Sequence, residues 1–430
     1  RKGVKWHRKY GTVSAEDVKF TFERLQDPKL ASPWAKKYSN IDKVEVIDAL
    51  NLKIYLKKAD PFFSMNLLPY HGGQIVCKKA VEKLGKEFAF SPIGSGPFMF
   101  EAYDKGQSVY LKGNPDYFRG KPILKSIDYI FMPDHSSRLL AIDKGEIDVS
   151  RGKRKREWAE QAIKKGIKLC PPNPPQQQLL VMNMTRKPLD DIRVRQAVAY
   201  AIDREAYLDI IGPVLGGKQI SPIPPGYFGH TEKDMEEYRY DLAKAKKLLA
   251  DAGYPDGIDL GSQFCSESDN YLRPLKIAQE QLRQAGIRFE IKVVDHSTYH
   301  KLIREDKNAL VIYGGVRLPI AETLLTQFYA KSSIVGTKTA ITNFSHYGEV
   351  IPGIDGFLEK AKATNDLKEK KKQYELAQYQ IIKDLPVYPL YLNRASLCYQ
   401  KWVDFGYDVD NYETLYYTVE ISEKTRLLKH

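Results

Sequence analysis

Strand-like apolar runs alternate with amphipathic helices from residue 178 to residue 392, and this order restricts the fold more than any other feature of the sequence. In the helix expected within 187–205, Val194, Val198 and Ile202 repeat every four residues and share one face. Within 287–294, apolar residues occupy every second position, which is the period of a strand. Strands that alternate with helices predict an α/β lobe with a largely parallel sheet.

Capping and chain-breaking residues mark the limits of these elements. We expect helices at 241–252, 269–285 and 298–304, a helix pair within 354–384, and strands at 178–183, 258–264, 309–313 and 387–392. The proline-rich run 171–175 precedes the first of these strands, and Pro386 precedes the last. We therefore place a crossing between two lobes at each of these points.

The N-terminal third contains shorter elements. Ser14 with Asp17 three residues later predicts the start of a helix, which Asp27 and Pro28 end. The runs 44–47 and 52–56 predict a β-hairpin. Residues 127–149 then predict a strand, a helix capped by Asp134, and a second strand.

Composition describes a globular protein. A chain of 430 residues with 43% hydrophobic and 28% charged residues is too long for one simple core, so we expect two or three domains. It contains no apolar run of the roughly 18 to 20 residues that span a bilayer. The sequence begins in mid-motif at Arg1, and we expect that an upstream part and an export signal are absent from it.

The formal charge of +13 is compatible with a nucleic-acid partner, an anionic membrane surface or a basic solvated exterior. The sharpest basic run, 153–156, is followed by Glu157 and Trp158 at the head of an amphipathic segment, so we interpret it as a helix surface. No zinc-finger spacing or RRM aromatic signature is present. We therefore expect no nucleic-acid partner.

Enzymatic and metal-binding motifs are missing from the sequence. Cys77, Cys170, Cys265 and Cys398 are far apart and form no CxxC pair, and neither a GxSxG nor an HExxH motif occurs. Of eight histidines, only the pair His296 and His300 has the spacing to share a helix face, without a third ligand nearby. We expect no catalytic residue, no metal site and no cofactor.

Four segments carry a family resemblance. These are 4–38, 91–122, the block 138–148 that ends in Gly-Glu-Ile-Asp, and 187–204, whose wording is KPLDDIRVRQAVAYAIDR. They resemble, in the same order, the motifs of the extracytoplasmic solute-binding proteins of ABC importers, family 5, which serve peptide, nickel and opine uptake. The resemblance extends over essentially the whole chain.

This resemblance implies an α/β, two-lobed periplasmic-binding-protein fold of class II, cluster C, with an extra β-rich subdomain. We expect the subdomain at 1–118, the first lobe at 119–181 and 392–430, and the second lobe at 182–391. The implied function is an importer's solute receptor that captures a peptide-like or other organic solute, anions included, and delivers it to permease subunits. The implied form is a monomer in the periplasm or a cell-surface lipoprotein.

Arg317 is the first candidate ligand-binding residue. Many peptide-binding relatives carry an acid at the matching position, where it pairs with the amino terminus of the peptide. Arginine reverses this charge and would favour a carboxylate or phosphate. The alternative is that Arg317 forms a structural salt bridge to a neighbour such as Glu322.

The resemblance supplies five further candidates. Tyr70 and Met99 stand where nickel-binding relatives have arginines, and His71 follows directly, so these three line the cleft or pack the domain. Asn343 and Tyr347 lie in a loop that resembles a family segment, and they face the cleft or cap the next helix. Some peptide-binding relatives carry a disulfide whose first cysteine falls near Cys170, but its partner position here matches Gly315, so the resemblance does not extend to that bond.

Three functions remain open from the sequence. The first is the solute receptor, the second is a hydrolase acting on a small substrate in an interlobe cleft, and the third is a basic nucleic-acid or surface adhesion protein.

Overall fold

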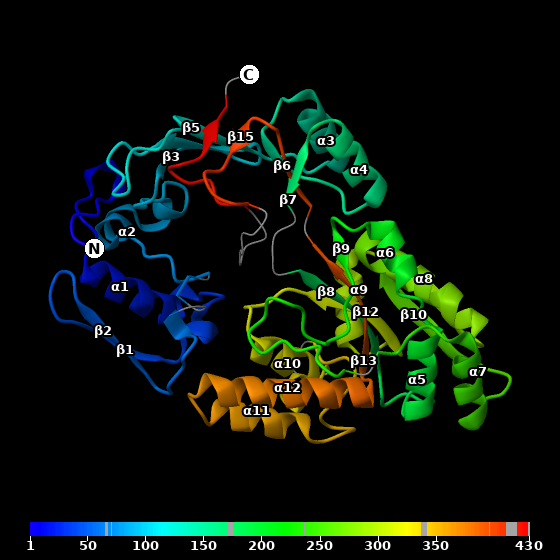
Figure 1. The fold of residues 1–430 in the computed structure, drawn as a ribbon. Helices are drawn as coiled ribbons and strands as arrows, with labels where there is room; N and C mark the ends of the chain where they lie inside the picture. The colour runs from blue at the N-terminus through cyan, green and yellow to red at the C-terminus, as the bar shows by residue number, and fades with distance from the viewer. Residues whose placement is uncertain are drawn as a thin grey trace.

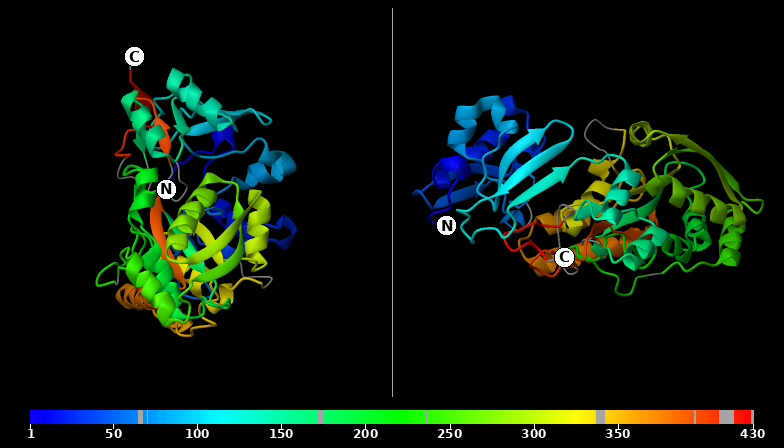
Figure 2. Two further views of the ribbon diagram at one scale, coloured as in Figure 1. Left: turned by 90° about the vertical axis from the view of Figure 1, so that its right-hand side faces the viewer. Right: turned by 90° about the horizontal axis from the view of Figure 1, so that it is seen from above.

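The computed structural model describes residues 1–430 except 65–67, 70, 171–174, 236, 337–341, 395, 410–418 and 429–430. Its N-terminal part, a small first lobe and a larger second lobe follow one another around the molecule (Figure 1). Seen from above, the N-terminal part and the outer helices of the second lobe lie at opposite ends (Figure 2). The first of the two expected crossings falls within 171–175, most of which lies outside the described residues.

The N-terminal part has the predicted helix and hairpin. Helix α1 (Ala15–Gln26) starts where the carboxylate of Asp17 accepts hydrogen bonds from the backbone N–H (2.9 Å) and the hydroxyl (3.0 Å) of Ser14. Strands β1 (Ile41–Val46) and β2 (Leu52–Leu56) pair antiparallel, and α2 (Lys78–Leu84) follows. Phe22, Tyr38 and Ile41 form the centre of a small separate core.

A second antiparallel sheet joins this part to the first lobe. It contains β3 (Phe98–Asp104), β4 (Ser108–Gly113) and β5 (Ser126–Ile130), in that order. Because β5 pairs with β4, the predicted limit at 118 falls between two strands of one sheet.

The first lobe is small and combines two distant chain segments. It contains α3 (His135–Lys144), β6 (Val149–Arg151), α4 (Arg156–Lys164), β7 (Lys168–Cys170), β14 (Leu397–Tyr399), β15 (Val403–Asp404) and β16 (Arg426–Leu427). Strand β14 lies between β6 and β7 and pairs antiparallel with both, so the returning chain completes the sheet. As predicted, the carboxylate of Asp134 caps α3 by accepting from the backbone N–H of Ser137 (2.7 Å).

The second lobe holds the largest core. Its strands are β8 (Gln176–Met182), β9 (Gly216–Gly217), β10 (Ile258–Ser266), β11 (Ile287–Val294), β12 (Leu310–Gly315) and β13 (Val387–Asn393). Its helices are α5 (Ile192–Ala201), α6 (Glu205–Ile211), α7 (Leu242–Asp251), α8 (Asp269–Gln284), α9 (His296–Arg304), α10 (Ala321–Tyr329), α11 (Ile354–Lys362) and α12 (Leu367–Asp384). Leu179, Leu180 and Val181 of β8 are buried, because helices cover both faces of the sheet.

The expectation of a largely parallel sheet is wrong for the centre of this lobe. The central order is β12-β8-β13-β9, and every pairing in it is antiparallel, whereas β10 and β11 form a parallel pair beside it. The lobe crossing explains the direction of the pair β8 and β13. Strand β8 enters the lobe and β13 leaves it, so these neighbours must run in opposite directions.

The two crossing strands also locate the junction between the lobes. The limit predicted at 181 falls inside β8, which belongs to the second-lobe sheet from Gln176 onward. Strand β13 ends at Asn393, close to the predicted return at 392. Among the described residues, no helix combines the length and apolarity needed to cross a bilayer.

Candidate functional site

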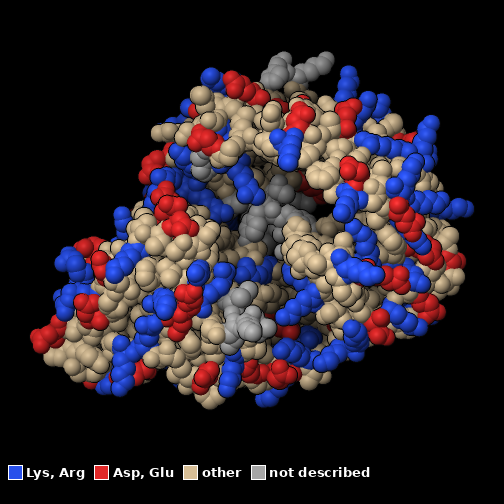
Figure 3. Space-filling view, turned by 180° about the vertical axis from the view of Figure 1, so that it is seen from behind, with Lys and Arg blue, Asp and Glu red and all other residues tan. Residues whose placement is uncertain are grey.

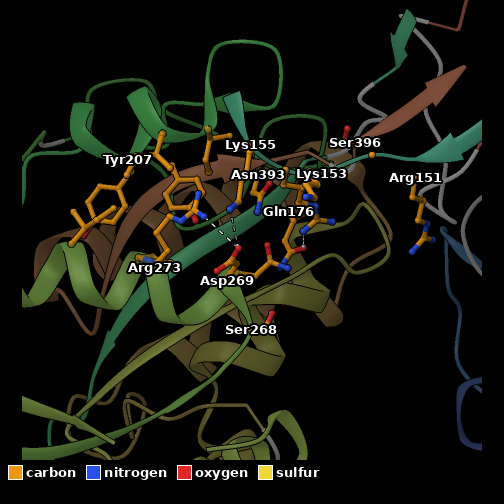
Figure 4. Close-up of a pocket in the computed structure, with 18 of the residues that line it drawn as sticks. Arg151, Lys153, Lys155, Gln176, Tyr207, Ser268, Asp269, Arg273, Asn393 and Ser396 are labelled. Carbon is orange, nitrogen blue, oxygen red and sulfur yellow. Dashed lines mark hydrogen bonds and ion pairs between the residues drawn. The ribbon is translucent and has the colours of Figure 1, made fainter. Parts of the chain in front are cut away.

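A cavity of about 620 Å³ lies at this junction, beside both crossing segments. Its walls come from the segment 151–155, the first residue of β8, helix α6, the N-terminal half of α8 and the end of β13 (Figure 4). Gln178 of β8 fixes the start of α8 here, because its amide Nε2 donates to the backbone carbonyl of Asn270 (2.8 Å). Residues from both lobes therefore surround one volume, as a two-lobed binding protein requires.

The charge of this cavity is strongly positive. Its basic lining residues are Arg138, Arg151, Lys153, Arg154, Lys155 and Arg273, and Asp269 is its only acidic lining residue. Asp269 contacts two of them, at 3.4 Å to the Lys155 ammonium and 3.3 Å to the Arg273 guanidinium. Lys and Arg side chains also border the hollow seen on the rear face (Figure 3). An organic anion would find several positive partners here.

Arg151 and Lys153 form no ion pair with any described acidic residue. Arg154 reaches the second lobe, where its guanidinium donates to Oε1 of Gln176 (3.4 Å). Arg151 ends β6, and Lys153 and Arg154 lie in the short loop between β6 and α4, so this segment places the basic side chains at the junction.

The interpretation of 153–156 as a helix surface is therefore wrong for three of its four residues. Helix α4 begins only at Arg156, which is exposed, whereas 153–155 are half-buried and line the cavity. Composition alone could not separate the two cases, because a solvated helix and a charged cleft use the same residues. The position of the run in the chain could have indicated the cavity, since the run lies between a strand and a helix and next to a lobe crossing.

Part of the cavity lining is apolar or aromatic. Tyr207 of α6 stacks on Tyr391 of β13 with ring centroids 5.7 Å apart, and Ile211, Pro274 and Ile277 extend this surface. Burial raises the pKa of Tyr207 well above its usual value, so its hydroxyl keeps its proton. The cavity therefore offers both apolar surface for the carbon skeleton of a solute and basic groups for an acid.

Arg317 lies outside this cavity. Its Nε donates to Oε1 of Gln327 (2.5 Å), and another guanidinium nitrogen donates to the carbonyl of Val316 (2.9 Å). The alternative ion pair with Glu322 is not formed, because Glu322 accepts the hydroxyl hydrogen of Tyr374 instead (2.5 Å). Burial, and then the charge of Arg317, lowers the pKa of Lys37 in the N-terminal part.

His71 and Met99 do not line the cavity. The ring of His71 stacks on Trp34 at 4.9 Å, and Met99 is half-buried in β3, paired with Lys112 of β4. Tyr70 lies outside the described residues.

Asn343 and Tyr347 have no exposed surface, at 0% each. The amide of Asn343 donates to the carbonyls of Ala330 (3.0 Å) and Tyr347 (2.8 Å). The hydroxyl of Tyr347 donates to the Asp384 carboxylate (2.6 Å). Their polar groups are used inside the second lobe, so we do not keep them in the proposed site.

The histidine pair lies on α9, with ring centroids 4.5 Å apart. Nδ1 of His296 is 3.1 Å from the Ser266 hydroxyl, and His300 packs against Tyr271 and Tyr299. Burial and the neighbouring His296 lower the pKa of His300 to about 4. The described residues contain no group of three or more His, Cys, Asp or Glu that could hold a metal ion, and all four cysteines are buried.

Comparison with known proteins shows which family has this architecture. Residues 1–336 match the family model of the bacterial extracellular solute-binding proteins, family 5. The glutathione-binding protein GsiB of Salmonella choleraesuis is 28% identical over 425 residues, which cover 96% of this chain and 81% of GsiB.

Solved structures agree with this match. MoaA from A. tumefacien R10, in complex with mannopinic acid, is 33% identical, with a TM-score of 0.80, over 100% of this chain and 85% of MoaA. DppA from Helicobacter pylori, in complex with the peptide STSA, is 28% identical, with a TM-score of 0.74, over 100% of this chain and 85% of DppA. The predicted fold class is confirmed.

Proposed function

Since the chain belongs to family 5 of the bacterial extracellular solute-binding proteins, we propose that it captures an organic anion in the basic cavity between its lobes. It is a solute-binding protein of the ABC importer type rather than an enzyme, so the expectation of a receptor is confirmed and the hydrolase and nucleic-acid alternatives are set aside. The choice of an anion is our proposal.

The observation that supports an anionic solute is the excess of positive charge around the cavity, with six basic lining residues against one acid. A carboxylate that enters can pair with Arg or Lys through charge-assisted hydrogen bonds, which are roughly twice as strong as neutral ones. An ammonium group would be repelled by the same side chains. The N-terminal half of α8 adds a helix dipole that also favours negative charge at its start.

Capture works by a population shift. A solute that contacts Arg154 of the first lobe and Arg273 of the second stabilises forms in which these surfaces approach, because it binds such forms more tightly than separated ones. We propose that permease subunits recognise this closed form. The protein would act outside the cytoplasm, in the periplasm or as a cell-surface lipoprotein.

The relatives suggest the size of the solute. MoaA was solved with mannopinic acid and DppA with a four-residue peptide, and GsiB is named for glutathione. A cavity of about 620 Å³ suits a solute of this order, since small-molecule pockets measure about 300 to 1,000 Å³.

The test is a thermal-shift panel that compares organic acids with neutral analogues of the same skeleton, followed by calorimetry of the hits. We expect acids alone to raise Tm, and we expect Lys153→Gln to weaken their binding by about tenfold, the range for a charged hydrogen bond. Lys164→Gln is the control, because Lys164 is exposed on α4 away from the cavity. Equal stabilisation by neutral analogues would refute the choice of an anion.

Arg317 is proposed as a second, outer contact for acidic solutes. We expect Arg317→Gln to weaken the binding of acids more than the binding of neutral solutes. The guanidinium of Arg317 has no described carboxylate partner and bonds only to a side-chain amide and a carbonyl. Arg239→Gln, at an exposed position, is the control. An equal loss for acids and neutral solutes would make Arg317 structural.

A further inference from the structure

Three uncharged polar atoms in the cavity wall have no hydrogen-bond partner among the described residues. They are Oδ1 of Asn393, Oγ of Ser396 and the hydroxyl of Tyr207. Their residues are only 2%, 4% and 1% exposed. Buried polar groups in folded proteins are almost always paired, so three unpaired groups around one cavity point to a missing partner.

These atoms come from three segments that meet at the cavity. Asn393 ends β13, Ser396 follows on the return to the first lobe, and Tyr207 projects from α6. The backbone holds Ser396 in place, because its carbonyl accepts from the N–H of Gly152 (2.8 Å). A Cβ added at Gly152 would lie 2.7 Å from the Ser396 hydroxyl and 2.0 Å from Trp158, so glycine keeps this position clear.

The chemistry of the three atoms defines what they can accept. Oδ1 of Asn393 is an acceptor only and therefore needs a donor from the solute. Ser396 and Tyr207 can each donate and accept, and Tyr207 keeps its proton because burial raises its pKa.

The donor that meets Asn393 should be uncharged. An ammonium could satisfy the oxygen of Asn393, but it would enter a cavity with six basic lining residues and one acid. A hydroxyl group can donate to Asn393 and accept from Ser396 or Tyr207 without this repulsion. Further hydroxyls on the same skeleton are the groups that would pair with the other two atoms.

We propose that the solute is a polyhydroxylated carboxylic acid, in which the acid pairs with the basic wall and the hydroxyls pair with Asn393, Ser396 and Tyr207. This inference rests on the proposed function and specifies its substrate class. The basic wall and the unpaired atoms then recognise two different parts of one molecule.

The test is calorimetry of the full chain with three probes: D-gluconate, hexanoate and sorbitol. Hexanoate has the same carbon number as gluconate without its hydroxyls, and sorbitol has the hydroxyls without the charge. We expect gluconate to bind at least about tenfold more tightly than hexanoate, and sorbitol to bind more weakly than both.

Variants assign the effect to the named atoms. Asn393→Leu and Ser396→Ala should each bring the ratio of gluconate to hexanoate affinity closer to one. Gln161→Leu, at an exposed position of α4, should leave that ratio unchanged. Circular dichroism and Tm confirm that each variant is folded before its affinities are compared.

The outcomes separate the two proposals. If hexanoate binds as tightly as gluconate, or if other acids bind and gluconate does not, the polyol inference is overturned and the anion receptor stands. If no acid binds at all, the proposed function itself fails. An unchanged ratio in the folded Asn393→Leu and Ser396→Ala proteins would also overturn the assignment of these atoms.

Discussion

The ring of Phe62 in the N-terminal part lies 5.1 Å from the ring of Phe228 in the second lobe. Phe62 is buried, and it packs with the core that surrounds Tyr227, Ala321 and Tyr374 rather than with its own subdomain. This contact links the N-terminal part directly to the second lobe, whereas the crossing strands link that lobe to the first. The second lobe is thus connected to the rest of the molecule at two separate places.

Loss of this ring should favour separated forms. We expect Phe62→Ala to weaken solute binding by roughly two- to tenfold, since an aromatic pair contributes about 0.5 to 1.5 kcal/mol. Small-angle scattering of the solute-free protein should show a larger radius of gyration. Phe90→Ala is the control, because Phe90 is highly exposed. An unchanged radius and affinity would show that the contact does not affect the balance between forms.

Asp269 competes with an incoming anion, because it occupies the Lys155 ammonium and the Arg273 guanidinium. Its side chain is 68% exposed, so these pairs are weak. We expect Asp269→Asn to tighten acid binding by up to about fivefold, the equivalent of about 1 kcal/mol for an exposed pair. Calorimetry provides the measurement, and Glu280→Gln on the same helix, whose partner is Arg283, provides the control. Weaker binding in Asp269→Asn would mean that Asp269 contacts the solute as an acceptor.

The elements that the sequence predicts well are those with local causes. Helices capped by Asp134 and Asp241 begin where expected, because the capping carboxylate and the amide it binds lie three residues apart. The predicted start at residue 298 is wrong for helix α9, because the residue that caps this helix is Asp295. Helix α9 begins at His296, two residues early, because Asp295 accepts from the backbone N–H of Thr298 (3.0 Å).

Strand direction and the cavity wall depend on residues far apart in the chain. The antiparallel pairing of β8 with β13 joins positions separated by about two hundred residues, and no local pattern encodes it. The cavity likewise needs Arg154, Asp269 and Asn393 at one place. The local sequence around each of these residues is typical of a surface or a strand and does not indicate a cavity. Family resemblance located the cleft in general but did not select these residues.

His300 should make the protein less stable in acid. Its pKa is lowered from 6.5 to about 4 by burial and by His296, so the unfolded chain binds a proton that the folded chain excludes. This stability is fully present above about pH 6.5 and is lost as the pH falls toward about 4. We expect His300→Phe to reduce the fall of Tm across this window relative to the unsubstituted protein. Parallel Tm curves for the two proteins between pH 7 and pH 4 would contradict this expectation.

Tyr347 provides a test that separates a structural residue from a ligand-binding one. Its buried hydroxyl donates to the Asp384 carboxylate at 2.6 Å, and the amide of Gln380 is a second donor at 3.0 Å. Tyr347→Phe removes the first donor and leaves a partly unsatisfied carboxylate, which should lower the free energy of unfolding by about 1 to 3 kcal/mol. Denaturant titration measures this loss. Acid affinity should stay within error of the unsubstituted protein, because the ring lies inside the second lobe with no exposed surface. A large loss of affinity with unchanged stability would instead return Tyr347 to the binding site.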